Sequence, residues 1–176
     1  MQAYQPLSRR SATSVSFGFP KIGPYYWVGH CQNGINYFAG QTFVAPATGT
    51  LKRIILFPSI VHGNTAASLS IYEFDNVNHA WQQKRAEVTR HVSKAMEGQW
   101  IDFEIPAMQV NKNSSYAFKL SCNSGGMLAI AECPWNITDP YAEGEEWIGS
   151  SQSPNGDFHK DFDLAFEGEI EKSFDA

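Results

Sequence analysis

The stretch GQWIDFEIPAMQVNKNSSYAFKLSCNSGGMLAIAEC (Gly98–Cys133) carries the clearest structural signal in the chain. Ile101, Phe103 and Ile105 alternate with two acidic residues, and over 116–122 every second residue is apolar. A period of two is typical of strands with one buried face and one solvated face. The stretch therefore predicts a sheet protein rather than a helical one.

Three strands follow from this pattern, at 101–105, 116–122 and 127–133. Pro106 ends the first strand, because proline cannot donate a ladder hydrogen bond, and an Asn-rich polar turn precedes the second. The segment NSGG (123–126) reads as a hairpin turn, since Asn and Gly adopt positive φ readily. We interpret the three strands as an antiparallel meander.

The same alternation extends to both ends of the chain. In the last strand, Gly168 falls on the apolar face, where it lets a large neighbour pack closely. The remaining strands are predicted at 15–19, 25–30, 36–46, 49–58, 67–75 and 163–171. Short strands at this spacing predict an all-β fold, a two-sheet antiparallel jelly-roll β-sandwich. We assign it to a single domain over 14–172, after a loose N-terminal tail at 1–13.

Residues 80–97 do not follow the pattern clearly. They contain no Gly or Pro, and their apolar residues form a loosely helical stripe. The β-branched residues and the surrounding strands favour two short strands, at 80–85 and 87–92, over a helix. One helical turn is expected near 93–97.

Composition limits the function. The chain of 176 residues is 43% hydrophobic and carries a net charge of −5, which argues against a nucleic-acid partner. No apolar run is long enough for a membrane span, and the N-terminus shows no secretory h-region. The compartment stays open: extracellular if a signal peptide was trimmed, otherwise cytoplasmic. Cys31, Cys122 and Cys133 lack metal spacing and favour free thiols, and Cys122–Cys133 is the best pair if a disulfide exists.

Four segments suggest a known kind of module. They are QTFVAPATGTLKRIILF (41–57), LSIYEFD (69–75), QWIDFEIPAMQVNKNSSYAFKLS (99–121) and DLAFEGEI (163–170). In this order they resemble the jelly-roll accessory modules of secreted bacterial proteins, which are similar to carbohydrate-binding modules and galactose-binding-like domains. The resemblance covers about 35–171 and implies the sandwich fold. It is weak for function, because such folds host many tasks.

The candidate ligand site is the long segment from Cys133 to Asp163. Long loops without obvious strands are often functional. Aromatic rings can stack on a sugar while carboxylates accept its hydroxyl hydrogens. The residues that we expect to bind a ligand are Trp135, Asp139, Tyr141, Glu143, Trp147 and Phe158. The alternative is that the rings fold inward and fill the end of the sandwich.

Two further sites were considered. A structural calcium ion, which jelly-roll modules often contain, could be held by Asp157, Asp161 and Asp163. The spacing of these residues matches no EF-hand, and a solvated acidic loop is the favoured interpretation. Tyr25–Trp27 is either a second stacking platform or an edge strand half in the core.

No catalytic signature appears in the sequence. Histidine spacing indicates no zinc site, and neither a nucleophile elbow nor a P-loop is present. Glu145 and Glu146 are adjacent and would face opposite ways in a strand, so they are a poor glycosidase pair. We therefore expect a non-catalytic module without a cofactor that binds a glycan. A structural, assembly or protein-binding module, including a homo-oligomer, is the alternative, and a polysaccharide-acting enzyme is less favoured.

Overall fold

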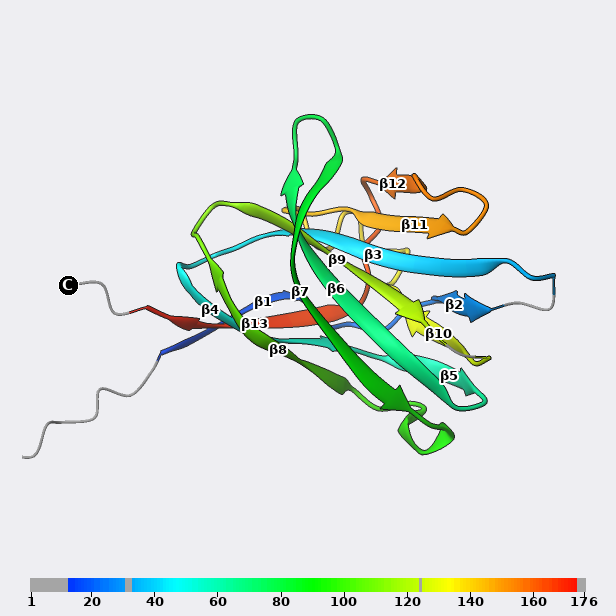
Figure 1. The fold of residues 1–176 in the computed structure, drawn as a ribbon. Coiled ribbons are helices and arrows are strands. Elements are labelled where there is room, and N and C mark those ends of the chain that lie inside the picture. Colours follow the sequence, from blue (N-terminus) through cyan, green and yellow to red (C-terminus); the bar gives the residue numbers. More distant parts are fainter. Residues whose placement is uncertain (1–12, 31–32, 124, 174–176) are drawn as a thin grey trace, which may run out of the picture.

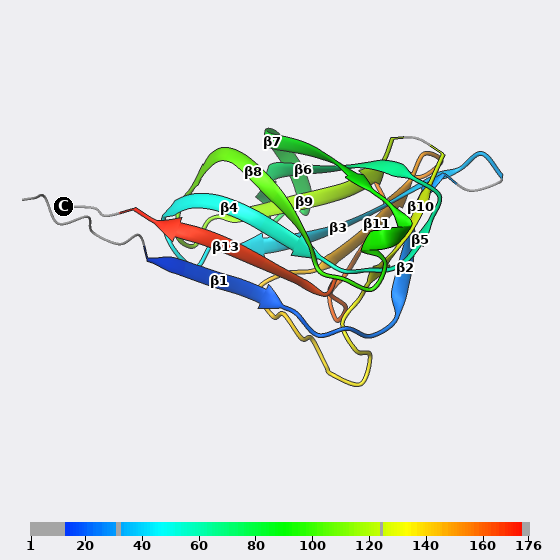
Figure 2. The ribbon, with the colours of Figure 1, turned by 90° about the horizontal axis from the view of Figure 1, so that it is seen from below.

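Two antiparallel sheets contain all the strands of the computed structural model, which describes residues 13–30, 33–123 and 125–173 (Figure 1). The smaller sheet has the order β1-β13-β4-β8. Its strands are β1 Ser14–Phe19, β13 Phe166–Lys172, β4 Gly49–Leu56 and β8 Ile101–Val110. Figure 2 shows this sheet lying over one face of the larger sheet. The predicted all-β, two-sheet sandwich of jelly-roll type is confirmed. The predicted tail lies outside the described residues, except for Thr13.

The larger sheet has the main order β5-β10-β2-β3-β9-β6-β7, and the β11–β12 hairpin joins it through β3. The early and central strands are β2 Tyr25–His30, β3 Asn36–Val44, β5 Pro58–His62, β6 Thr65–Asp75 and β7 Ala80–Val92. The later strands are β9 Ser115–Cys122, β10 Met127–Ala131, β11 Glu146–Ser150 and β12 Asp157–His159. β11 and β12 lie within the long segment that the sequence left without strands.

Phenylalanine rings from both layers fill the space between the sheets. Phe17 of β1 stacks on Phe43 of β3 at 5.0 Å between ring centroids, and Phe118 of β9 meets Phe166 of β13 at 5.6 Å. Gly168 lies opposite Phe17 in the β1–β13 ladder, where an added Cβ would come within 2.1 Å of the ring. The prediction that Gly168 admits a large neighbour is therefore confirmed.

The predicted meander is wrong, although its strands exist. β8 belongs to the smaller sheet and β9 to the larger one, and β2 and β3 separate β9 from β10. The segment NSGG therefore joins two strands that do not pair. Alternation shows that a strand has one buried face, but both sheets of a sandwich offer such a face, so alternation cannot choose between them.

Two loops cross from one sheet to the other. The β3–β4 loop and the β8–β9 loop both pass from one sheet to the other, and they are hydrogen-bonded to each other. The amide of Asn113 donates to the Ala45 carbonyl at 2.8 Å, and the amide of Ala45 donates to the Ser114 carbonyl at 3.0 Å. These paired crossings hold the two layers in register.

Pro106 does not end its strand as predicted. β8 continues to Val110, and the ladder with β4 shifts register between Leu51 and Arg53, opposite Pro106. β8 is an edge strand of its sheet, and edge strands and bulges are where a strand tolerates proline.

The unclear segment is one long strand rather than two short ones. β7 runs from Ala80 to Val92 and pairs with β6, with irregular register near Tyr72. The expected helical turn is present as a short 3-10 helix, η1 Lys94–Met96. The expectation of strands over a helix is confirmed, and the predicted break between them is wrong.

Cys122 and Cys133 are free and buried, as predicted, and Cys31 lies outside the described residues. Burial and the nearby carboxylates raise the pKa of the Cys133 thiol to about 12. Within the described part of the chain, no helix is both long and apolar enough to span a bilayer.

Candidate functional site

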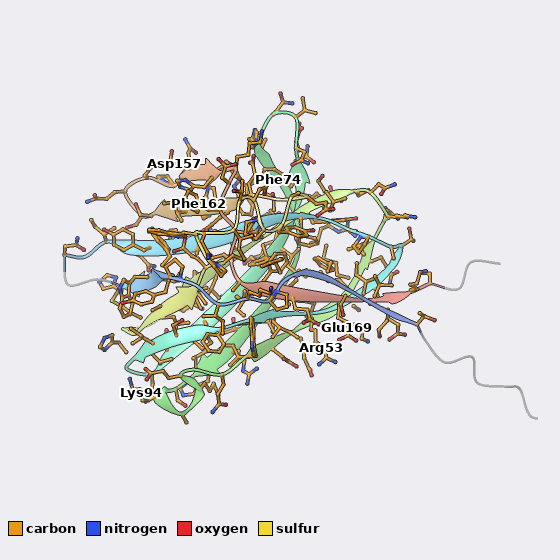
Figure 3. All side chains as sticks on the ribbon, turned by 180° about the vertical axis from the view of Figure 1, so that it is seen from behind. Arg53, Phe74, Lys94, Asp157, Phe162 and Glu169 are labelled. Atoms are coloured by element: carbon orange, nitrogen blue, oxygen red, sulfur yellow. The ribbon has the colours of Figure 1, made fainter. Side chains whose placement is uncertain are left out.

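A hollow of about 310 Å³ opens where β2, β11 and β12 meet the loop that follows β10. We call it the aromatic–acidic hollow. It is lined by Tyr25, Tyr26, Glu132, Trp135, Glu146, Ile148, His159 and Phe162. In Figure 3, Phe162 lies in the same part of the molecule as Asp157, away from Arg53 and Glu169 of the smaller sheet.

The backbone holds Glu132 at one wall of this hollow. β10 pairs with β2 through Ala131 and Tyr25, so the residue after β10 faces the entry to β2. The Glu132 amide donates to the Pro24 carbonyl at 2.8 Å, and the Gly23 amide donates to the Glu132 carbonyl at 2.7 Å. Two backbone bonds therefore fix the position from which the Glu132 side chain projects.

Glu146 comes from the opposite direction, on β11. Its backbone pairs with Gln41 of β3 and His159 of β12, and its amide donates to the Phe162 carbonyl at 3.0 Å. The period of two along β11 places Glu146 and Ile148 in the hollow, while Trp147 points to the other side. Local strand geometry thus directs the carboxylate inward.

Exposed aromatic rings surround the hollow. Trp135 is 68% exposed, Tyr25 46% and Phe162 41%, which are high fractions for such large apolar side chains. The rings of Trp135 and Phe162 touch edge to face at 6.1 Å between centroids. The rim therefore presents aromatic surface that the described residues leave largely uncovered.

The floor of the hollow is acidic. The Glu146 side chain is 1% exposed, and neither of its carboxylate oxygens meets a donor among the described residues. Burial raises the pKa of Glu146 well above its usual value, and the carboxyl of Glu132, within hydrogen-bonding range, raises it further. The buried Nε2 of His159 also has no partner in the described structure. Buried polar atoms are nearly always hydrogen-bonded, so these are unusual.

Only one of the predicted ligand residues reaches this hollow. Trp135 lines it, whereas Asp139 and Glu143 line a separate polar hollow of about 200 Å³ beside Glu145. Glu145 is paired there with His79 at 2.8 Å. Glu145 and Glu146 thus face different hollows.

Tyr141 and Trp147, two of the predicted ligand residues, have buried rings, although Tyr141 lines a hollow of about 400 Å³ together with Glu143. The Tyr141 ring is buried against Phe166 at 5.2 Å, and Trp147 is 1% exposed. An added Cβ on Gly149 or Gly156 would come within 2.5 Å or 2.7 Å of the Trp147 indole, so the ring occupies a slot that glycines leave open. For these two rings the alternative of inward packing holds.

Phe158 is half-buried in an aromatic cluster that joins two hairpins. It contacts Phe74 at 5.4 Å and His79 at 5.2 Å, and Trp81 of β7 contacts Trp147 at 5.2 Å. This cluster attaches the tip of the β6–β7 hairpin to β11 and β12, close together in Figure 1. Phe158 therefore stabilises the packing of the hairpins and does not line the aromatic–acidic hollow.

The suggested calcium ligands do not converge. Asp163 is buried, accepts a hydrogen bond from Gln41 Nε2 at 2.8 Å and another from the Tyr141 amide at 3.0 Å. Asp157 and Asp161 are exposed, and the described residues contain no group of three His, Cys, Asp or Glu arranged to hold a metal ion. The carboxylate of Asp163 therefore links β3 to the loop at Tyr141 through these two hydrogen bonds. The suggestion of a calcium site built on these three residues is therefore wrong.

A larger hollow, of about 450 Å³, lies between the edge strands β7 and β8. Two of its charged side chains have partners: Arg90 donates to the Asp102 carbonyl, and the Asp102 carboxylate pairs with Arg53 at 2.9 Å. Unlike Glu146, none of its lining residues has a buried side-chain oxygen or nitrogen without a partner.

Sequence reasoning missed Glu132, His159 and Phe162 as site residues and set Glu146 aside. Tyr25 was noted as a possible platform, but nothing connected it to Trp135. The connection depends on β10 pairing with β2, which no short-range pattern shows.

Comparison with known proteins identifies no family. No protein-family model and no curated protein matches the sequence. Among solved structures, the VP2 subviral particle of infectious bursal disease virus matches 98% of this chain and 46% of its own, at 12% identity and a TM-score of 0.32. This chain thus spans less than half of that VP2 chain. The K1 cleaved adhesin domain of Lys-gingipain from Porphyromonas gingivalis W83 matches 68% of this chain and 95% of its own, at 10% identity and a TM-score of 0.31. At TM-scores this low, neither likeness supports a conclusion about this chain.

Proposed function

We propose that this domain is a non-catalytic binding module that takes a carbohydrate in the aromatic–acidic hollow. The observation that carries the proposal is the combination of exposed rings at the rim with unpartnered polar groups at the floor. Trp135 and Tyr25 supply the rings, and Glu132, Glu146 and His159 supply the polar groups.

This combination suits the two surfaces of a sugar. The C–H face of a pyranose packs on an aromatic ring, and its hydroxyl groups need hydrogen-bond partners when they leave water. A carboxylate is an acceptor, and the second nitrogen of a histidine can accept or donate. A volume of about 310 Å³ lies at the small end of ligand sites, which fits one or two sugar units rather than a long chain.

A protein contact is the alternative that the exposed rings favour. Ile22, on the connection that leads into β2, is also exposed. Contiguous exposed apolar surface often marks an interface with another protein or with a second copy of the chain. An interface would use the rim and leave the acidic floor without a role.

Isothermal titration against a panel of oligosaccharides tests the proposal. Trp135→Ala should abolish measurable binding, because it removes the ring with the largest exposed fraction at the rim, and truncating such a Trp anchor costs about 2 kcal/mol or more, a large part of a weak affinity. Trp100→Ala is the matched control, since Trp100 is also exposed but lines the hollow between β7 and β8. It should bind as the unmodified protein does.

The two functions give different results. A carbohydrate module binds a glycan and stays monomeric at all concentrations used. A protein interface gives a concentration-dependent mass by light scattering, and Trp135→Glu abolishes it. The carbohydrate proposal fails if no glycan binds, or if Trp135→Ala and Trp100→Ala bind equally well.

A further inference from the structure

The Glu146 carboxylate raises a question that a neutral sugar does not answer. A buried carboxylate without donors is one of the least favourable groups in a folded protein, and such groups are normally paired or bound to a cation. Glu146 lines an open hollow rather than the sealed core. Its missing partner can therefore come from outside the chain.

The charges around the hollow are of one sign. Glu132 adds a second carboxyl group, and the lining residues include no lysine or arginine. None of the ion pairs between described residues involves Glu132 or Glu146. Among the described residues, no lysine or arginine therefore supplies a counter-charge in the lining of this hollow.

The rim favours the same kind of partner. A cation over the face of an aromatic ring is attracted by the ring's quadrupole, and Trp is the strongest such ring. Trp135 and Tyr25, two exposed rings, line the same hollow as the Glu132 and Glu146 carboxyl groups. An ammonium group has three donors, enough to bridge two carboxylates and still meet a ring or a hydroxyl group.

We propose that the aromatic–acidic hollow selects a sugar that carries a free, protonated amine, with the ammonium group placed between Glu132 and Glu146. This inference rests on the proposed function and names its ligand class. The sugar ring stacks on Trp135, and the ammonium group supplies the donors that the Glu146 oxygens lack. An N-acetylated sugar lacks this charge and offers one N–H donor in place of three.

Proton release follows from this arrangement. Glu146 faces Glu132 at the end of β10, His159 on β12, Asp163 before β13 and Tyr25 and Tyr26 on β2. Because burial and the neighbouring carboxyls favour its protonated form, an arriving ammonium group displaces a carboxyl proton to the solvent. The observed binding heat should therefore change with the ionisation enthalpy of the buffer.

A pair of matched oligosaccharides tests the inference on the full chain. The probes are a glucosamine hexamer without acetyl groups and the same hexamer fully N-acetylated, titrated at a pH where the amines are protonated. We expect the amine form to bind about 10- to 100-fold more tightly than the N-acetylated form. This is the range that a hydrogen bond to a charged group contributes to an affinity. Glu146→Gln should remove most of that preference, and Glu132→Gln provides a second variant should the first fold poorly.

Glu104→Gln is the matched control, because Glu104 is exposed on β8 and does not line this hollow. It should keep the full preference. Equal binding of the two hexamers, or a preference that Glu146→Gln leaves intact, overturns the inference while the carbohydrate proposal stands. Absence of binding by both hexamers, and by the wider glycan panel, overturns both.

Discussion

Replacing Glu146 by Gln should make the unliganded domain more stable above neutral pH. The wild-type carboxylate is buried and meets no donor among the described residues. The glutamine side chain has the same shape, carries no charge and can donate to Glu132. Removing one unsatisfied buried group of this kind is worth about 1–3 kcal/mol. For a domain of this size that raises the melting temperature by about 2–12 °C.

The pH dependence identifies the cause. The folded-state pKa of Glu146 is raised above its unfolded value, so its contribution to stability is present below the unfolded value and is lost as the pH rises through the folded value. The advantage of Glu146→Gln should therefore be absent near pH 4 and should grow as the pH rises towards 8. Asp163 also destabilises the wild type as the pH rises, since burial raises its pKa to about 6, but it does so equally in the variant.

Thermal unfolding followed by circular dichroism between pH 4 and pH 8 measures this difference. Glu104→Gln, which removes an exposed glutamate, should stay within about 0.5 kcal/mol of the wild type. A Glu146→Gln variant that is less stable than the wild type at pH 8 would refute the reasoning. So would an equal gain at pH 4 and pH 8, because the gain would then not come from the charge.

Three other outcomes are expected. Trp147→Ala should lower the free energy of unfolding in urea by about 3–5 kcal/mol, as for other large core rings. Trp135→Ala should change that free energy by less than about 0.5 kcal/mol, because its ring is exposed. Similar losses for both variants would contradict the burial of Trp147. Gly168→Val should lower the free energy of unfolding by about 1–3 kcal/mol, because the valine side chain would overlap the Phe17 ring. An unchanged urea midpoint would show that this contact is absent. In a Cys31→Ser background, a thiol reagent at pH 8 should label Cys122 and Cys133 only when the protein unfolds. Both thiols are buried, and burial raises the pKa of Cys133 to about 12. Rapid labelling of the folded protein would contradict this burial.

Much of the fold could be predicted because alternation is a local property. The buried and solvated faces of β8 and β9 follow directly from residues such as Phe103 and Phe118, and Gly168 was placed correctly by the same reasoning. The assignment of β8 and β9 to different sheets could not be predicted. It depends on where the loop at Asn113 crosses, and both sheets accept the same alternating strand.

The site was less predictable, for a related reason. An exposed Trp135 and an acidic segment could be read from composition. The meeting of Glu132 with Glu146 could not, because it requires β10 to pair with β2 and β11 to pair with β3. The buried Trp147 shows the converse: a ring in a candidate loop packs inward once glycines leave a slot for it.

The signals of the tryptophan indole N–H groups test the central claim most directly. The chain has 5 tryptophans, so a protein labelled with ¹⁵N-tryptophan gives one resolved indole signal for each. On titration with the glucosamine hexamer, the Trp135 signal should shift to saturation while those of Trp100 and Trp147 stay in place. A saturating shift of Trp100 with Trp135 unmoved would place the ligand between β7 and β8 and contradict the site described for this domain.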